Sequence, residues 1–111
     1  MIRVLAILPL LLLTAAGVEP QSSEDAEALA LGRQILAVQR ALGDPDKPES
    51  LKAVTALGTD SRHYVMVRGW LVQLLAGDES IAEAAGGKPA EAVAARIRFL
   101  RKAIRAIDLE K

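Results

Sequence analysis

The stretch VAARIRFLRKAIRAI, residues 93–107, carries five large aliphatic residues at alternating intervals of four and three. These are Val93, Ile97, Leu100, Ile104 and Ile107. This spacing places all five on one side of an α-helix, since residues three and four apart share a helix face. The stretch therefore predicts an amphipathic helix whose apolar face packs against the core of the domain or against another chain.

The segment from residue 62 to 76, RHYVMVRGWLVQLLA, is apolar around most of its circumference when it is read as a helix. One stripe consists of Tyr64, Val67, Leu71 and Leu74, and it is flanked by Val65, Val72 and Leu75. Such a helix is usually central and buried. Gly69 in its interior costs about 1 kcal/mol relative to alanine, so we expect a neighbouring helix to cross closely at this residue.

Two helices are expected in the first half of the chain. Residues 23–42 carry an apolar stripe at helical spacing, made of Leu31, Ile35, Val38 and Leu42. Ser22 and Asp25 form a capping-box-like pair at its start, and a glycine ends it. After a polar turn with two prolines, residues 50–57 form a short helix that Gly58 ends.

Three helices are expected in the second half. Asp60 is the predicted N-cap of the helix over residues 62–76. Gly77 then ends that helix, and a short alanine-rich helix follows over residues 78–85, with Asp78 as its cap. A pair of glycines separates it from the last helix, which a proline opens. Five helices, two of them short, and no strand predict an all-α domain built as a small orthogonal or up-down bundle.

The first 17 residues, MIRVLAILPLLLLTAAG, predict a secretory signal peptide. A basic start is followed by an apolar run and then by small residues, which is the order of such a signal. Cleavage is expected after Ala16 or after Gly17. The alternative is an uncleaved membrane anchor, although a spanning helix needs about 20 apolar residues and the run over residues 4–18 is shorter. We therefore expect an exported chain, periplasmic or secreted, with a single domain over residues 18–111.

The composition excludes several classes of protein. The 111 residues include 14 Lys and Arg against 14 Asp and Glu, one histidine and no cysteine. The missing cysteines exclude a disulfide scaffold, a cysteine nucleophile and a thiolate zinc or iron–sulfur site. Balanced charge excludes a protein that coats polyanions. We expect no nucleic-acid partner, because export removes that substrate and no aromatic residues alternate with the basic ones, and we expect no cofactor.

Residues that could carry catalysis or bind a metal are few. His63 lies near Asp60 and Ser61, but residues this close together at a helix start do not provide the geometry of a catalytic triad. The acidic residues within 44–49 lack the glycine and the ligand order of a calcium loop. A small helical domain is also not expected to hold two carboxylates across a cleft, as glycosidases do. We therefore predict no catalytic and no metal-binding residues.

Five basic residues are candidates for contacts with an anionic ligand or partner: Arg62, Arg68, Arg98, Lys102 and Arg105. The first two interrupt an apolar helix, where an arginine needs either an acidic residue of the fold or an anionic ligand as its partner. The last three share one face of the last helix. That face is either a solvated surface or a contact for anionic lipid headgroups or an acidic partner.

Two segments, DSRHYVMVRGWL (60–71) and RFLRKAIRAIDLE (98–110), behind a signal peptide, resemble a group of small exported bacterial proteins without established function. The resemblance covers most of the mature chain and implies an all-helical fold in the cell envelope, but no catalytic or binding residue. The stretch GDPDKPESLKAVTALG (43–58) resembles one helix-turn-helix unit of HEAT-type repeats. A solenoid needs about three such units, and the sequence has no second copy.

The sequence favours a non-enzymatic helical interaction protein of the cell envelope, whose partner is an envelope protein or a second copy of the chain. One alternative is a small-ligand-binding or enzymatic domain that uses the region of His63, Arg68 and Trp70. Another is peripheral association with an anionic membrane surface through the basic last helix.

Overall fold

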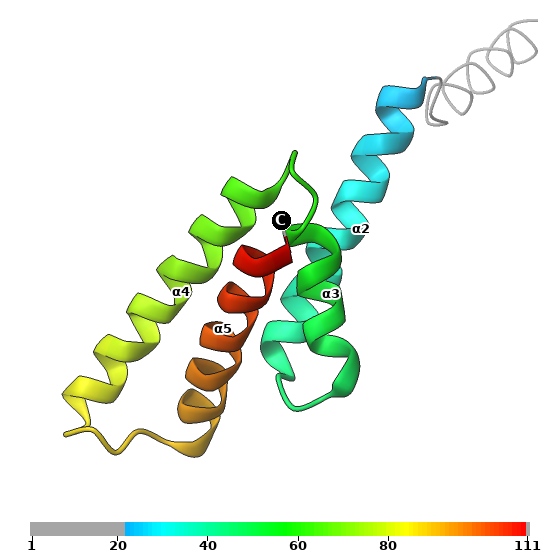
Figure 1. Ribbon diagram of the computed structural model, residues 1–111. Coiled ribbons are helices and arrows are strands. Elements are labelled where there is room, and N and C mark those ends of the chain that lie inside the picture. Colours follow the sequence, from blue (N-terminus) through cyan, green and yellow to red (C-terminus); the bar gives the residue numbers. More distant parts are fainter. Residues whose placement is uncertain (1–21, 111) are drawn as a thin grey trace, which may run out of the picture. The chain divides into compact units, whose positions relative to one another are not determined.

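The computed structural model describes residues 22–110, which form helices and contain no strand (Figure 1). The four helices are α2 (Ser23–Gly43), α3 (Pro48–Gly58), α4 (Tyr64–Ala84) and α5 (Glu91–Glu110). The all-α prediction is confirmed for this part of the chain. The signal peptide expected over residues 1–17 lies outside the described residues.

The chain divides into two compact units after Gly32, within α2. In the first unit the described residues are the start of α2, where the side chains of residues 22–30 are all exposed. Ser22 Oγ accepts a hydrogen bond from the backbone N–H of Asp25 at 3.2 Å, which confirms Ser22 as a helix cap. Acidic residues in this first turn also lie at the positive end of the helix dipole.

The second unit holds the hydrophobic core. Helices α4 and α5 lie side by side and run in opposite directions, and α3 contacts both (Figure 1). The largest fully buried side chains are those of Val38, Val54, Leu57, Val67, Leu71, Leu100 and Ile107. The apolar face predicted for residues 93–107 packs against this core, since Ile97, Leu100 and Ile107 are all buried.

The helix end expected at Gly77 is wrong, because α4 continues without a break from Tyr64 to Ala84. The described residues therefore form four helices rather than five. Asp78 is not an N-cap but a buried side chain within α4 that forms an ion pair with Arg96 of α5. A glycine costs only about 1 kcal/mol in a helix, so this contact between helices overrides the local signal. The break predicted at the two glycines after residue 85 is confirmed, since both have positive φ.

The close approach between helices occurs at Gly58 and not at Gly69, where it was expected. Gly69 is exposed, and a Cβ added there would meet no atom within 4 Å. Gly58 is buried at the end of α3, and a Cβ added there would lie 2.7 Å from Cγ2 of Ile107 and 3.3 Å from Cγ1 of Val67. The missing side chain of Gly58 is what lets α3 pack against α4 and α5.

Candidate functional site

Asp60 is not the N-cap of α4, which begins at Tyr64 with His63 in the cap position. Its carboxylate instead binds within the turn that precedes the helix. Oδ1 accepts hydrogen bonds from the backbone N–H of Arg62 at 2.9 Å and from Nε of the same residue at 3.2 Å, and Oδ2 accepts one from Nη2 at 2.9 Å. Arg62 thus has a carboxylate partner within the fold.

These hydrogen bonds, first those from the Arg62 guanidinium, lower the pKa of Asp60 from 3.8 to about 2. Because the pKa in the folded protein is below the ordinary value, the contact contributes fully above about pH 3.8 and is lost as the pH falls through about 2. We expect an NMR titration of the Asp60 carboxyl carbon to have its midpoint near pH 2.

The variant Arg62→Ala should move this midpoint part of the way back towards 3.8, because the backbone N–H of residue 62 remains a donor. The control Arg40→Ala, an exposed arginine on α2, should leave the midpoint unchanged. An Asp60 midpoint near 3.8 in the unaltered protein would contradict the arrangement of the turn.

Arg68 and Tyr64 of α4 both bind Asp108 near the end of α5. Arg68 donates from Nε to Oδ1 at 2.9 Å and from Nη2 to Oδ2 at 3.2 Å, and the Tyr64 hydroxyl donates to Oδ1. These hydrogen bonds to the carboxylate raise the pKa of Tyr64 and of Arg68 above their ordinary values. The partner that the sequence required for Arg68 is therefore an acidic residue of the fold.

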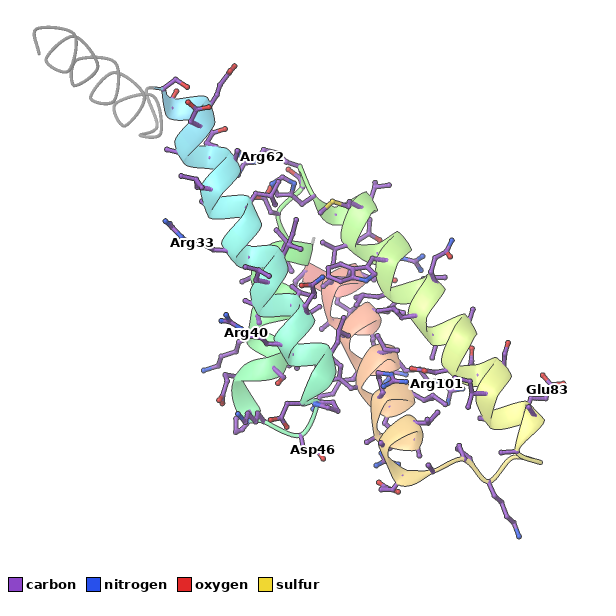
Figure 2. The ribbon with its side chains drawn as sticks, turned by 180° about the vertical axis from the view of Figure 1, so that it is seen from behind. Arg33, Arg40, Asp46, Arg62, Glu83 and Arg101 are labelled. Atoms are coloured by element: carbon purple, nitrogen blue, oxygen red, sulfur yellow. The ribbon has the colours of Figure 1, made fainter. Side chains whose placement is uncertain are left out.

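The basic residues of α5 are largely paired with acids of the same chain. The ion pairs join Arg96 to Asp78 at 2.6 Å, Arg98 to Glu91 at 2.8 Å and Arg101 to Glu79 at 2.7 Å. Figure 2 shows Arg101 on the side of α5 that is turned towards α4. Lys102 and Arg105 are exposed. The candidates Arg98, Lys102 and Arg105 thus all lie on α5, and Arg98 is paired with Glu91 of the same helix.

Arg68 and Trp70, which the sequence grouped with His63, contact different elements. Arg68 binds Asp108 of α5. Trp70 instead lines a hollow of about 330 Å³ together with Met66 of α4 and with Ile35 and Gln39 of α2. The two side chains therefore do not converge on one site.

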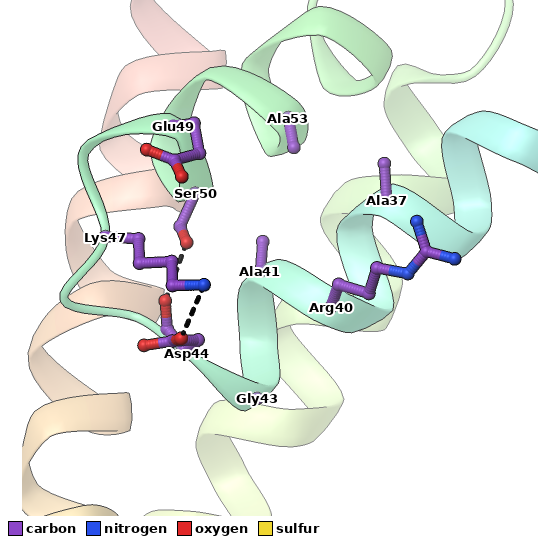
Figure 3. A pocket seen from close by; sticks show the side chains of 9 residues that line it. All are labelled: Ala37, Arg40, Ala41, Gly43, Asp44, Lys47, Glu49, Ser50 and Ala53. Carbon is purple, nitrogen blue, oxygen red and sulfur yellow. Dashed lines mark hydrogen bonds and ion pairs between the residues drawn. The ribbon is translucent and has the colours of Figure 1, made fainter.

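A second hollow, of about 570 Å³, lies between the end of α2 and the start of α3 (Figure 3). Its charged lining residues are Arg40, Asp44, Lys47 and Glu49. Lys47 Nζ lies 3.2 Å from Asp44 Oδ2 in an exposed ion pair, and Ser50 Oγ donates to the Asp44 carbonyl at 2.6 Å. Because charges of both signs surround the hollow, its chemistry selects for no single class of ligand.

Two further kinds of site can be assessed for residues 22–110. Within that range no group of three or more His, Cys, Asp or Glu residues is placed to hold a metal ion. None of the helices that the structure describes is long and apolar enough to span a membrane.

One side of α4 is apolar and uncovered. We call it the outer face of α4 and define it by six exposed residues: Val65, Met66, Gly69, Val72, Gln73 and Ala76. Met66 lies at the edge of this face, beside the hollow that it lines with residues of α2. Within residues 22–110 seven large apolar side chains are exposed, and four of them, Val65, Met66, Val72 and Ile81, belong to α4. The side chain of Val65 is 79% exposed. None of the six residues is charged.

The expectation that this helix is central and buried is therefore correct for one side of α4 and wrong for the other. Val67 and Leu71 are fully buried, because α3 and α5 cover that side of α4. Mean hydropathy does not distinguish a covered side from an uncovered one. The signal that was missed is the series Val65, Gly69, Val72 and Ala76, with intervals of four, three and four. This spacing places two valines and two small residues in alternation on one side of the helix.

Comparison of the chain with protein-family models, with curated proteins and with solved structures finds no match. The outer face of α4 is the candidate functional site because of its own chemistry. It is the part of the described surface where exposed apolar side chains gather without charge.

Proposed function

We propose that this chain is a non-enzymatic helical interaction protein and that it binds a helix of a protein partner through the outer face of α4. The observation that carries the proposal is the exposure of Val65, Met66 and Val72 on a face without charged residues. Together with the signal peptide expected over residues 1–17, it supports a role among proteins of the cell envelope.

The physical reason is the free energy of apolar surface in water. Each square ångström of apolar surface that a partner covers contributes about 25 cal/mol. Single exposed apolar side chains are common on soluble proteins, but an uncharged series along successive turns is typical of an interaction surface. A helix is the partner that fits best, because an uncharged stripe along one helix pairs with a stripe of the same kind on another.

We expect the association to be weak. The outer face of α4 extends over about 16 Å of helix and so covers less than the roughly 800 Å² per partner of a standard interface. A dissociation constant in the micromolar range, which corresponds to about −8 kcal/mol, is the expected result.

A photoreactive benzoylphenylalanine in place of Val72, in the full chain produced in cells, should form a covalent adduct with a protein partner on illumination. The same residue in place of Lys52, an exposed position on α3, is the matched control and should form none. Adding Val65→Glu to the Val72 reporter should remove the adduct, because it introduces a charge into the apolar contact. Gel mobility and mass spectrometry measure all three.

Either of two results would refute the proposed function. One is the absence of an adduct at Val72 under conditions where the folded protein is abundant. The other is equal adduct formation at Val72 and at Lys52, since that pattern indicates random collisions rather than a defined surface.

A further inference from the structure

The outer face of α4 alternates large and small residues along one line. The side chains of Val65 and Val72 project from it. Gly69 lies between the two valines and Ala76 lies one turn after Val72, and both form recesses. Val65 is 79% exposed and Val72 40% exposed, so both side chains are available to a partner.

The recess at Gly69 receives no side chain from the rest of residues 22–110. A Cβ added to Gly69 would meet no atom within 4 Å, so no neighbouring element among residues 22–110 approaches it. A glycine in the interior of a helix nevertheless lowers helix stability relative to alanine. A side chain of a second molecule that enters this recess would offset the cost.

The pattern is complementary to itself when two copies of α4 lie antiparallel. With a two-fold axis between residues 70 and 71, Val65 of each copy faces Ala76 of the other, and Val72 faces Gly69. Each of the two valines then meets a small residue. In a parallel pair each residue would face its own counterpart. The facing valines would then crowd each other, and the facing glycines would leave a gap. Because the face carries no charge, two copies meet without like-charge repulsion.

We infer that the partner of the outer face is a second copy of this chain, bound antiparallel about a two-fold axis between residues 70 and 71. Such a contact uses the same patch on both subunits and closes as a dimer. This inference rests on the proposed function and specifies its partner.

The absence of cysteine in the sequence makes the arrangement testable by single introduced cysteines. The full-chain variants Val65→Cys and Ala76→Cys are purified from the cells that produce them. Each is oxidised alone, and an equal mixture of the two is oxidised as well. In the antiparallel dimer the thiol introduced at position 65 of one copy faces the thiol introduced at position 76 of the other. Identical positions are instead about 16 Å apart along the helix axis, beyond the reach of a disulfide.

The mixture should therefore yield a cross-linked heterodimer in several-fold excess over either homodimer. Adding Val72→Glu to both variants should abolish the heterodimer, whereas an association through other parts of the chain would not respond to this change. Homodimers that form as readily as the heterodimer would overturn the antiparallel arrangement.

A second measurement separates the recess from helix stability in general. Gly69→Ala and the matched control Gly77→Ala both place a methyl group in open space on α4. Both should raise the melting temperature of the monomer by about 2–6 °C, because alanine is the better helix former. Only Gly69→Ala should weaken dimerisation, by several-fold, because only it narrows the recess that receives Val72.

Sedimentation equilibrium measures the dimerisation constant of each variant. Equal dimerisation of the Gly69→Ala variant and the unaltered chain would refute the pairing. A photoreactive adduct at Val72 with a different protein, in the absence of the cysteine heterodimer, would refute the second copy and leave the proposed function intact. The absence of any adduct would refute both.

Discussion

Replacing Arg96 with methionine should lower the free energy of unfolding by about 3 kcal/mol. Asp78 is only 5% exposed, and both of its carboxylate oxygens accept hydrogen bonds from Arg96, from Nε and from Nη2, each at 2.6 Å. The variant leaves this carboxylate buried without a compensating charge, which is the costly way to break an ion pair. The Arg96 side chain is 35% exposed, so water replaces part of the lost interaction and the loss falls at the lower end of the usual range.

Urea unfolding, monitored by circular dichroism, measures this loss. The comparison requires that the slope of the unfolding free energy with urea concentration is the same in both proteins. The control is Arg101→Met, which breaks the pair with Glu79 on the same two helices. The side chains of Arg101 and Glu79 are 58% and 46% exposed, so the expected loss of unfolding free energy is below about 1 kcal/mol. Losses of equal size in the two variants would show that burial of Asp78 does not determine the stability of the α4–α5 contact.

The double variant Arg96→Met with Asp78→Leu refines the interpretation. Replacing both members of a buried ion pair by apolar residues is often close to neutral. The double variant should therefore recover most of the stability that Arg96→Met loses, and the departure from additivity measures the coupling between the two side chains. A double variant less stable than the single one would indicate that the pair also fixes the geometry of α4.

The substitution Gly58→Ala should cost about 1–3 kcal/mol, although glycine to alanine in a helix normally stabilises. The new Cβ would lie 2.7 Å from Cγ2 of Ile107 and 3.3 Å from Cγ1 of Val67. Both neighbours are fully buried, and both are β-branched, so their side chains turn only with difficulty. The helices themselves must separate, and the core loses contact over all three of them.

Two comparisons test this explanation by thermal and urea unfolding. Gly43→Ala changes the last residue of α2, where an added Cβ meets no atom within 4 Å, and should be neutral or slightly stabilising. Ile107→Leu removes the methyl group nearest to the new Cβ. The double variant Gly58→Ala with Ile107→Leu should therefore lose less unfolding free energy than the two single variants lose in sum. Strict additivity would contradict the proposed clash.

The helical period predicted most of the fold. The spacing of apolar residues over 93–107 identified both the helix α5 and its buried side, because a face that packs on a core leaves a direct mark on the sequence. The end expected for α4 failed for a physical reason. Gly77 is a local helix-ending signal, whereas the contact that keeps α4 helical joins Asp78 to Arg96, 18 residues further along the chain.

The candidate site was harder to predict. Gly58 was correctly predicted to end α3, but the close approach expected at Gly69 occurs at Gly58. The two glycines look alike in the sequence, because whether a glycine allows a close approach depends on the element that packs against it. The outer face of α4 was likewise expected to be buried. The sequence of a helix predicts how much of its surface is apolar, but it does not predict how many other helices pack against that surface. The cost of an unpaired charge on an apolar helix, in contrast, correctly predicted that Arg68 has an anionic partner. The structure identifies this partner as Asp108 of α5 and not as a ligand.

The position of Ile107 and Asp108 has a consequence for the order of folding. Ile107 fills the space beside Gly58, and Asp108 receives hydrogen bonds from Tyr64 and Arg68. During synthesis these two residues emerge after Gly58, Tyr64 and Arg68. Helices α3 and α4 therefore remain without their cover, with Val67 and Leu71 open to water, until nearly all of α5 has left the ribosome. The core therefore closes late, when the buried side of α5 reaches α3 and α4.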